Sequence, residues 1–362
     1  MDITINELGQ LTPDSYILLD MRGDVEVGHG IIPGAIHMSK EEILEKYSGG
    51  LVKADEAEAA EREDSAEKKL IIYCARGRIS QELAEELRDR GYDAYSLKGG
   101  YTSWLLNEMK NQQADEVCAQ VEKSIRKKFR KNIWCKFTKA INQYELVKEG
   151  DCIAVCISGG KDSMLMAKLF QELKLHNKFP FEVKFVVMDP GYSPENRKVI
   201  EENARKLKIP IHIFESDIFE SVYHIEKSPC YLCARMRRGY LYNFAKELGC
   251  NKIALGHHYD DVIETILMGM LYGAQIQTMM PKLHSTNFEG MELIRPLYLI
   301  REDDIKAWRD YNDLRFIQCA CKFTDTCTTC NNEENQSKRV EIKQLIAEIK
   351  KKNPYVEAHI FK

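Results

Sequence analysis

The sequence predicts an α/β protein with more than one domain, and three observations support this class. Apolar runs of strand length alternate with stretches of helical periodicity along most of the 362 residues. Strand–helix alternation is typical of parallel sheets that helices cover on both faces. The clearest instance is Cys152–Ser163, where an apolar run ends in Ser-Gly-Gly-Lys-Asp-Ser and a helical pattern follows. The length allows two or three domains with sizeable cores.

The composition indicates a globular protein without membrane spans. Hydrophobic residues make up 44% of the chain and charged residues 30%. No apolar run reaches the roughly 18 residues of a transmembrane helix. The N-terminus lacks the basic and apolar regions of a secretory signal, so we expect a cytoplasmic protein. There, the 12 cysteines favour metal or redox chemistry over disulfides.

Residues 1–112 form the first predicted domain. The runs with the pattern of buried strands are Tyr16–Asp20, Leu70–Cys74 and Tyr95–Leu97. Ser80–Arg90 has a helical pattern, whereas Ala54–Lys69 lacks an apolar stripe and is expected to be a solvated insertion. This domain carries 13 Lys/Arg and 22 Asp/Glu, a net charge of −9, and the remainder carries 39 and 34, a net of +5. The remainder is therefore the better candidate for contact with nucleic acid.

Cys74 is the chemical candidate of the first domain. It lies at a strand end, before a short loop with Arg76 and Arg78 and a helix start. Loop N–H groups, the helix dipole and two arginines would each stabilise a thiolate, which is how a nucleophilic or persulfide-carrying cysteine is built. The alternative is a buried apolar cysteine, and the flanking arginines argue against it.

This first domain resembles the rhodanese family. The matching stretches are Ile17–Arg22, Gly30–Ala35, and Gly99–Tyr101 with Trp104. The resemblance implies a rhodanese-like fold and persulfide chemistry at Cys74. The sequence differs where Ile31 replaces the usual His and where Ile79 stands in place of the Arg that usually ends the active loop. These differences leave the sulfur donor open.

Residues 113–150 are predicted to be a basic connector. Apolar residues recur at three- and four-residue steps among many Lys and Arg, which predicts an amphipathic helix with one basic face. Arg126, Lys127 and Arg130 are the candidates for contact with RNA phosphates. A solvated face on a domain-joining helix explains these charges equally well.

Residues 151–362 predict a doubly wound parallel sheet. The expected strands are Cys152–Ile157, Glu182–Met188, Ile211–Glu215 and Lys252–Gly256. The expected helices are about Asp162–Leu173, Pro194–Leu207, Leu232–Leu248 and Asp261–Leu271. Polar loops that follow strands should meet at the carboxyl edge of the sheet, where ligands bind. These loops are Ser158–Ser163, Asp189–Gly191 and Gly256–Asp261.

The loop Ser158–Ser163 is the candidate nucleotide site. Gly159 and Gly160 allow a phosphate to approach the N–H groups of a helix N-terminus, and Lys161 adds a positive charge. Asp162 could hold a metal ion or cap the helix. A plain helix cap between strand and helix is the alternative for the whole loop.

The neighbouring loops supply further nucleotide candidates. These are Asp189, Gly256, His257 and Asp261. The pair Asp260 and Asp261 could bind Mg²⁺ near phosphates. Because an Asp pair before a helix is often only an N-cap, that alternative stays open.

The cysteines beyond residue 229 have the spacing of metal ligands. Cys230 and Cys233 form a Cys-x-x-Cys motif, whose sulfurs can reach one metal, and remote cysteines can complete the site. The downstream cysteines are Cys319, Cys321, Cys327 and Cys330. This spacing allows a Zn²⁺ site or an iron–sulfur cluster. Arg237 and Arg238, which follow the motif, could hold RNA phosphates or form a solvated helix face.

Residues 121–345 resemble the tRNA 2-thiocytidine synthetase family, PP-loop ATP-pyrophosphatases with an adenine nucleotide α-hydrolase-like fold. The matching stretches are Ser158–Ser163, Cys230–Gly239, Lys252–Asp261, Met280–Leu283, Ile294–Leu297 and Arg301–Ile305. The resemblance implies a [4Fe–4S] cluster on three cysteines, of which Cys230 and Cys233 match directly. Counting forward from Asp304 selects Cys319 as the third ligand, whereas the family's second Cys-x-x-Cys selects Cys327, and Cys321 is a further candidate.

This resemblance implies ATP-dependent tRNA thiolation with release of AMP and pyrophosphate. Lys161, Asp162 and Mg²⁺ would act in adenylation of a pyrimidine carbonyl, most simply cytidine C2, and Cys74 would relay sulfur as a persulfide. The implied partners are tRNA and a sulfur donor such as a cysteine desulfurase or thiosulfate, with a homodimer as one candidate assembly. Two other functions stay open: thiolation of another base or a small molecule, and a non-catalytic zinc-binding protein that binds RNA or senses sulfur.

Overall fold

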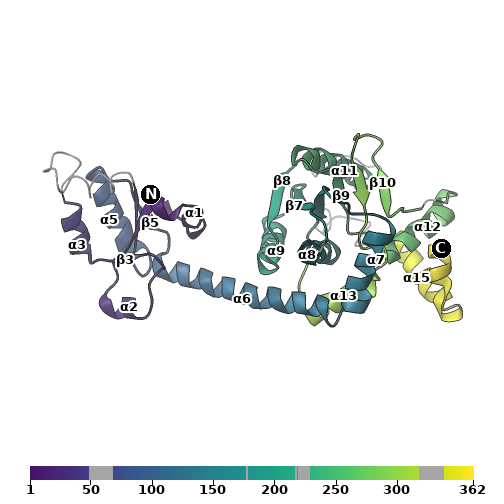
Figure 1. The fold of residues 1–362 in the computed structure, drawn as a ribbon, viewed down its shortest axis with the longest axis horizontal. Coiled ribbons are helices and arrows are strands. Elements are labelled where there is room, and N and C mark those ends of the chain that lie inside the picture. Colours follow the sequence, from purple (N-terminus) through teal and green to yellow (C-terminus); the bar gives the residue numbers. More distant parts are fainter. Residues whose placement is uncertain (49–67, 177, 217, 219–228, 277, 318–337) are drawn as a thin grey trace. The chain divides into compact units, whose positions relative to one another are not determined.

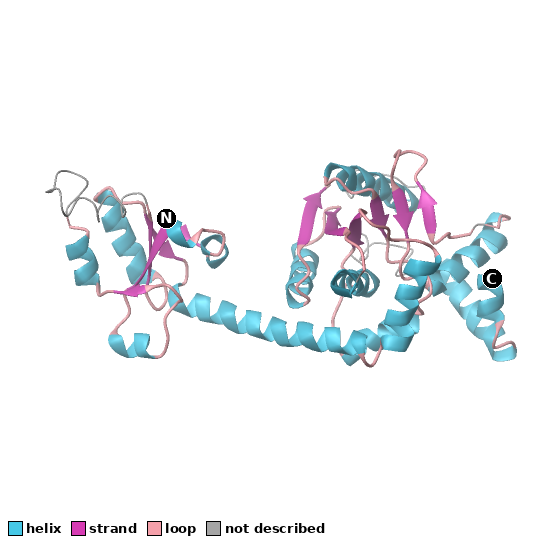
Figure 2. Cartoon of the chain, in the orientation of Figure 1, coloured by secondary structure: helices cyan, strands magenta, loops and turns pink. Residues whose placement is uncertain are grey.

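The computed structural model divides the chain into two compact units, Met1–Gln113 and Ala114–Lys362. The structure describes the chain except residues 49–67, 177, 217, 219–228, 277 and 318–337, and it describes only the backbone at 229–234. Each unit is built on its own sheet with helices beside it (Figures 1 and 2). The predicted α/β class is therefore confirmed.

The first unit has a five-stranded sheet in the order β1-β5-β4-β2-β3, with every neighbouring pair parallel. The strands are β1 (Asp2–Ile3), β2 (Tyr16–Asp20), β3 (Ile36–His37), β4 (Lys69–Tyr73) and β5 (Ala94–Leu97). The helices are α1 (Ile5–Leu8), α2 (Asp24–Gly28), α3 (Lys40–Lys46) and α5 (Arg78–Asp89). The sequence analysis missed β1 and β3, because two-residue strands carry no periodic pattern. Most of the predicted insertion Ala54–Lys69 lies outside the described residues.

Side chains of successive strand residues enter two separate cores, as the pleat requires. Leu70 and Ile72 of β4 pack with Leu83 of α5, whereas Ile71 and Tyr73 pack in the other core. Helices α3 and α5 therefore cover one face, and Leu8 of α1, Ile32 and Trp104 pack on the other.

The predicted basic connector contributes to the core of the second unit. It consists of the end of α6 (Gly100–Arg126), a π-helical turn (Arg130–Trp134) and α7 (Cys135–Gln143), so it is not one continuous helix. The apolar residues of this stretch, Ile125, Phe129, Ile133 and Phe137, are all buried. A π-helical turn has more residues per turn than an α-helix, which suits the four-residue spacing of the last three.

No described helix in the chain is both long and apolar enough to cross a membrane.

The second unit has a six-stranded sheet in the order β10-β11-β9-β6-β7-β8. The strands are β6 (Cys152–Ile157), β7 (Glu182–Asp189), β8 (Ile211–Glu215), β9 (Lys252–Ala254), β10 (Lys282–His284) and β11 (Glu292–Ile294). All neighbours are parallel except β10 and β11. The sequence analysis missed β10 and β11, which extend the sheet beyond β9 with three residues each.

Helices cover both faces of this sheet, which confirms the doubly wound arrangement. The helices of this unit include α8 (Lys161–His176), α9 (Pro194–Lys206), α11 (Pro229–Glu247), α12 (Tyr259–Gly273), α13 (Glu302–Tyr311), α15 (Lys338–Lys352) and α16 (Val356–Phe361). Val155 of β6 packs with α7 and α8 on one face, and Cys156 packs with α11 on the other. Burial raises the pKa of the Cys156 thiol to about 12.

The C-terminal helices α15 and α16 pack on α12 (Figure 1). Ile342 and Ile346 of α15 meet Ile263 of α12, and the rings of Tyr259 and Phe361 stack with centroids 4.1 Å apart. This packing brings polar residues of α15 to the N-terminal turns of α12 and α13.

Candidate functional site

The Cys74 loop is the first candidate site. Cys74 directly follows β4 and is buried, and its Sγ accepts hydrogen bonds from Gly77 N–H at 3.1 Å and from Ser80 Oγ at 3.4 Å. Burial alone would raise the pKa of this thiol, but hydrogen bonds from Ser80, Arg76 and Gly77 outweigh it and lower the pKa below the ordinary value. The thiolate is therefore stabilised mainly by the loop backbone and Ser80.

Two glycines let the chain approach this loop closely. A Cβ on Gly100 would lie 2.1 Å from the Cys74 carbonyl oxygen, and a Cβ on Gly77 would lie 2.9 Å from the Gly99 nitrogen. Gly77 and Gly100 also have φ values of 84° and 58°, which glycine adopts most easily. Tyr101 N–H then donates to the Cys74 carbonyl at 3.0 Å. The Gly-Gly motif thus holds the loop in place.

A buried polar network supports the same sheet edge. Arg22 is 6% exposed and binds Asp20 through several hydrogen bonds, the shortest 2.6 Å. Tyr73 donates to Asp20 at 2.8 Å and accepts from Ile32 N–H at 3.1 Å. The Arg22 guanidinium also lies 3.6 Å from the centre of the Tyr101 ring. Asp20 and Arg22, from the matching stretch Ile17–Arg22, therefore connect the end of β2 to Tyr73 and Tyr101.

Arg76 and Arg78, which the sequence analysis expected to stabilise the thiolate, are exposed, as is Ile79. They border the Cys74 loop from the solvent side. Such exposed cations are suited to attract an anionic sulfur donor more than to bury a charge.

The second candidate site is the loop Ser158–Ser163 between β6 and α8. Ser158 N–H donates to Ser163 Oγ at 3.1 Å, and Ser163 Oγ donates to the Gly160 carbonyl at 3.0 Å. Gly159 has a φ of 82°, and a Cβ there would lie 2.7 Å from Ile200. The loop is therefore a tight turn that delivers the N-terminus of a 16-residue helix to the carboxyl edge of the sheet. Such an edge binds phosphates.

Lys161 of this loop is held by two carboxylates. Lys161 Nζ lies 3.1 Å from Asp162 Oδ2 and 3.2 Å from Glu302 Oε1. Glu302 begins α13 and was not singled out from the sequence, although it falls in the stretch Arg301–Ile305 that matched the family. Burial alone would raise the pKa of Glu302, but contacts with Lys343, Lys161 and Lys306 lower it to about 2.

Asp162 offers the free carboxylate oxygen of this site. Its Oδ1 is buried without a hydrogen-bond partner in the described part of the chain, and His258 Nε2 is 3.9 Å away. A buried carboxylate oxygen without a partner fits a hard cation such as Mg²⁺. Asp162 therefore suits the metal alternative of the sequence analysis.

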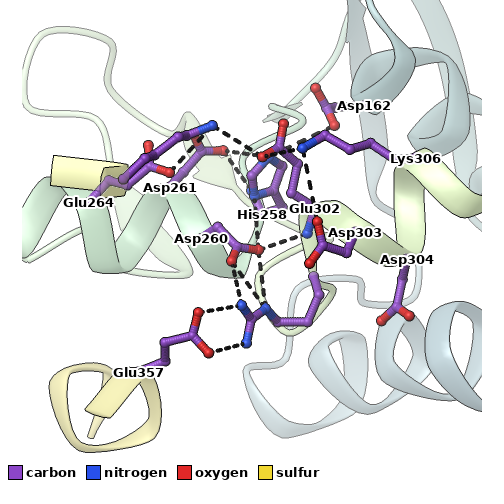
Figure 3. Close-up of polar contacts among 12 residues, drawn as sticks. Asp162, His258, Asp260, Asp261, Glu264, Glu302, Asp303, Asp304, Lys306 and Glu357 are labelled. Carbon is purple, nitrogen blue, oxygen red and sulfur yellow. Dashed lines mark hydrogen bonds and ion pairs between the residues drawn. The ribbon is translucent and has the colours of Figure 1, made fainter. Parts of the chain in front are cut away.

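Asp260 and Asp261 are largely occupied by the protein itself (Figure 3). Asp261 Oδ2 accepts His258 N–H at 3.0 Å at the start of α12, and Asp260 Oδ2 accepts Glu302 N–H at 2.7 Å at the start of α13. Asp260 also pairs with Arg301 at 2.8 Å, and Arg301 pairs with Glu357 at 2.6 Å. The structure thus favours the helix-capping alternative for this pair.

The remaining nucleotide candidates border the loop in different ways. Asp189 Oδ1 accepts hydrogen bonds from Tyr192 N–H at 2.6 Å and from Gly191 N–H at 2.8 Å, so it shapes its own turn. A Cβ on Gly256 would lie 3.2 Å from Ser163 N, so Gly256 allows close packing on α8. Burial lowers the pKa of His257 to about 4, so this ring is neutral at physiological pH.

A cavity of about 680 Å³ opens beside the loop. Its lining includes Lys161 and Asp162 from α8, Lys306 and Arg309 from α13, and Arg315. The volume suits a nucleotide-sized ligand, and the lining combines four basic side chains with the carboxylates of Asp162, Asp310 and Asp313. The segment that ends at Ile317 runs along this cavity, and Ile317 N–H donates to the Gly159 carbonyl at 3.3 Å.

The predicted RNA-binding residues differ in their surroundings. Arg126 forms ion pairs with Glu122 at 2.9 Å and with Glu172 at 2.8 Å. These carboxylates partly neutralise the Arg126 guanidinium within the protein. Lys127 and Arg130 are exposed beside the buried apolar face, and Arg238 is exposed on α11. Arg237 of the same helix is only partly exposed.

The structure leaves the predicted cluster ligands undescribed. Cys230 and Cys233 lie in the first turns of α11, where the structure describes the backbone alone. Cys319 and its alternatives Cys321 and Cys327 lie outside the described residues.

The C-terminal helix α15 contributes site residues that the sequence analysis missed. Lys343 Nζ lies 3.1 Å from Glu302 Oε2 and 3.6 Å from Glu264 Oε1, and Arg339 pairs with Asp261 and Glu264 at 3.4 and 3.1 Å. Burial raises the pKa of Glu264 to about 7 despite Lys343 and Arg339. No sequence signal distinguishes Lys343 from the other lysines of this charged helix.

Comparison with known families agrees with both candidate sites. A PP-loop domain matches residues 129–327, and a rhodanese-like domain matches residues 4–107. Fold and site together therefore define a PP-loop protein with an N-terminal rhodanese-like domain.

Curated relatives narrow this class. The chain is 36% identical over 246 residues to a tRNA-cytidine(32) 2-sulfurtransferase of Vibrio parahaemolyticus, covering 66% of this chain and 76% of that protein. It is 35% identical over 235 residues to the protein of that name in Chromohalobacter salexigens, covering 63% and 78%. The chain belongs to this family of PP-loop sulfurtransferases, which confirms the resemblance found in the sequence.

A solved structure is also similar. It is the U34-tRNA thiolase NcsA from Methanococcus maripaludis with its [4Fe-4S] cluster, which is 21% identical with a TM-score of 0.49. The match covers 62% of this chain and 75% of the thiolase chain.

Proposed function

We propose that this protein thiolates cytidine in tRNA, using ATP to activate the C2 carbonyl and Cys74 to supply sulfur. One observation carries the proposal: a single chain joins the PP-loop Ser158–Ser163, at the N-terminus of α8, to a loop that stabilises a cysteine thiolate. Identity of 36% to a tRNA-cytidine(32) 2-sulfurtransferase supports the choice of substrate. Residues 1–112 would supply sulfur, and residues 151–362 would activate the base.

The first step would be adenylation. The C2 carbonyl oxygen of cytidine attacks the α-phosphorus of ATP, the bond to the β-phosphate breaks, and pyrophosphate leaves. The N-terminus of α8 and the Lys161 ammonium would stabilise the negative charge that develops on the phosphates. Asp162, through its unpartnered Oδ1, would hold Mg²⁺, which neutralises phosphate charge when bound. Ser158, Gly159, Gly160 and Ser163 would form the rest of the cradle, bordered by Asp189, Gly256, His257 and Asp261.

The second step would replace oxygen by sulfur. Hydrosulfide attacks C2, and the oxygen leaves with AMP. Cys74 would carry the sulfur as a persulfide, and attack by a second thiol would release hydrosulfide and form a disulfide. Cys230, Cys233 and Cys319 would hold a [4Fe–4S] cluster, with Zn²⁺ as the alternative metal, and when bound this group would supply an affinity for sulfur at the site.

The substrate base must leave its stack to reach the PP-loop, so a single-stranded loop of tRNA fits this site. Lys127 and Arg130 are exposed and suited to RNA phosphates. Arg126 would contribute less, because Glu122 and Glu172 bind its guanidinium. Arg237 and Arg238 would contact RNA near the N-terminal half of α11.

Nucleoside mass spectrometry tests this function. A host without its own 2-thiocytidine enzyme would express the intact chain, Lys161→Ala or Cys230→Ala. We expect 2-thiocytidine only with the intact chain. A different thionucleoside would support the thiolation chemistry but exclude cytidine as the substrate. If the soluble intact chain yields no thionucleoside, the small-molecule and non-catalytic alternatives replace the proposal.

A second experiment tests the role of Cys74. The Cys74→Ala variant should lose thiolation that depends on a persulfide donor and retain thiolation with free sulfide. Equal activity of this variant and the intact chain with both sulfur sources would exclude the relay.

A further inference from the structure

We propose that Lys343 of α15 is a positioning residue for the PP-loop lysine and acts on it through Glu302. The inference rests on the proposed function, because it concerns the ATP site. Glu302 Oε1 lies 3.2 Å from Lys161 Nζ, and Glu302 Oε2 lies 3.1 Å from Lys343 Nζ. One carboxylate therefore joins the lysine of the nucleotide loop to a lysine almost 200 positions later in the chain.

The two carboxylate oxygens of Glu302 have different partners. Lys306 also binds Oε2, at 3.1 Å, so two ammonium groups hold that oxygen while the other faces Lys161. The Glu302 side chain is only 15% exposed, so solvent screens these contacts weakly. Fixing the carboxylate in this way fixes the direction in which Lys161 extends.

The charge balance leads to the same conclusion. A carboxylate beside the phosphate site repels ATP and competes with phosphate for the Lys161 ammonium. Lys343 and Lys306 neutralise Glu302 through its other oxygen, Oε2, which leaves Lys161 able to transfer to the phosphates. Without Lys343, Glu302 would hold Lys161 more strongly and in a less defined direction.

Packing of α15 makes Lys343 a built part of the site. Ile342 precedes Lys343 and is buried against α12 together with Ile346. Arg339, one turn earlier, pairs with Glu264 at 3.1 Å, and the Glu264 side chain is 3% exposed. An isolated surface ion pair contributes little, but Lys343 is held by its helix against two carboxylates that are largely buried.

Substitutions separate the charge of Lys343 from its packing. Lys343→Met keeps the aliphatic stem and removes the charge, so we expect ATP to bind roughly three- to tenfold more weakly. Lys343→Arg keeps the charge and should bind ATP nearly as the unaltered chain does. Lys350→Met is the matched control: Lys350 lies on the same helix, is 46% exposed against 44% for Lys343, and pairs at 2.8 Å with Glu357. Glu357 keeps its bidentate contact with Arg301 in that control.

The test is calorimetric titration of the full chain with Mg²⁺ and α,β-methylene-ATP. This analogue cannot transfer its adenylyl group to a substrate. Each variant is also placed in a Glu302→Gln background, and thermal unfolding checks that it is folded. If Lys343 acts through Glu302, Lys343→Met should weaken binding in the original chain and have little further effect in the Glu302→Gln background. A merely structural role of Lys343 would give the same loss in both backgrounds.

Three results would overturn the inference. They are unchanged binding by folded Lys343→Met, an equal loss in both backgrounds, and an equal loss in Lys350→Met. If the unaltered chain binds no nucleotide, the proposed function fails and this inference with it. If the binding results are as expected but no tRNA is thiolated, only the proposed substrate chemistry fails, because the ATP site behaves as described.

Discussion

The Cys74 loop and the PP-loop both present functional groups at the ends of parallel strands, but different interactions hold the two groups in place. The thiolate of Cys74 is stabilised by hydrogen bonds from residues within six positions, on a backbone held by close glycine contacts. Lys161 instead depends on side-chain ion pairs that reach α13 and α15. The first site is therefore a local structure, whereas the second needs the tertiary packing of the whole unit.

Removing Lys161 should give the largest effect and test whether the two sites work independently. Lys161→Ala takes away the only side-chain cation of the PP-loop, so we expect AMP formation to fall about 10²- to 10³-fold. Transfer of sulfur from thiosulfate to cyanide at Cys74 should be unchanged. Parallel assays of one preparation measure both rates. A loss of both activities in a folded variant would contradict the independence of the sites.

Gly100→Ala should damage the Cys74 loop through its backbone. The new Cβ would lie 2.1 Å from the Cys74 carbonyl oxygen, so we expect about 2–4 kcal/mol lower stability of the first unit and loss of sulfur transfer. Gly34→Ala is the control, because Gly34 also has a positive φ, 83°, but nothing lies within 4 Å of its Cβ. Thermal unfolding compares the two variants. Similar destabilisation by both would show that strain in φ alone explains the effect.

Glu264 should make the stability of the second unit depend on pH. Its pKa of about 7 lies above the ordinary value of 4.5, so the folded protein binds this proton more tightly than the unfolded chain. The stability that this group contributes is therefore lost as the pH rises from about 4.5 to 7. Glu264→Gln should remove this pH dependence, which amounts to about 1–3 kcal/mol in the free energy of unfolding.

Glu302 should show the opposite sign. Its pKa of about 2 is depressed, so its contribution is present above pH 4.5 and lost as the pH falls toward 2. Denaturant unfolding of Glu264→Gln and Glu302→Gln at several pH values measures both slopes. Slopes of the same sign would contradict the opposite pKa shifts of Glu264 and Glu302.

Ser80→Ala should give the smallest effect. It removes one of the hydrogen bonds that lower the pKa of Cys74, while Gly77 N–H still donates to the sulfur. The fraction of thiolate at neutral pH should fall, and alkylation of Cys74 by iodoacetamide should slow several-fold. Alkylation as fast as in the unaltered chain would assign the thiolate to backbone groups alone.

This contrast explains what the sequence could reveal. The Cys74 loop and the PP-loop were predictable because their functional groups lie within one short segment, after strands whose apolar runs are continuous. The predicted β6 and β8 match the observed bounds, Cys152–Ile157 and Ile211–Glu215. Strands of two or three residues, such as β3 and β11, were missed because they are too short for any period.

The contacts of the PP-loop lysine were not predictable in the same way. Glu302 meets Lys161, and Lys343 meets Glu302, only after α13 and α15 have packed beside α8 and α12, and no spacing in the sequence encodes these contacts. The same packing decides the role of Asp260, whose carboxylate caps α13 and binds Arg301. It also places the apolar half of the predicted connector, including Phe129 and Phe137, in the core of the second unit.

Burial of thiols limits which described cysteines of this protein can exchange with a persulfide. Burial raises the pKa of both Cys156 and Cys250 to about 12, so these cysteines stay protonated and exchange slowly with persulfides. Cys74 has a lowered pKa and is the thiol suited to accept sulfur. Burial in the sheet core thus keeps these two cysteines out of thiol exchange.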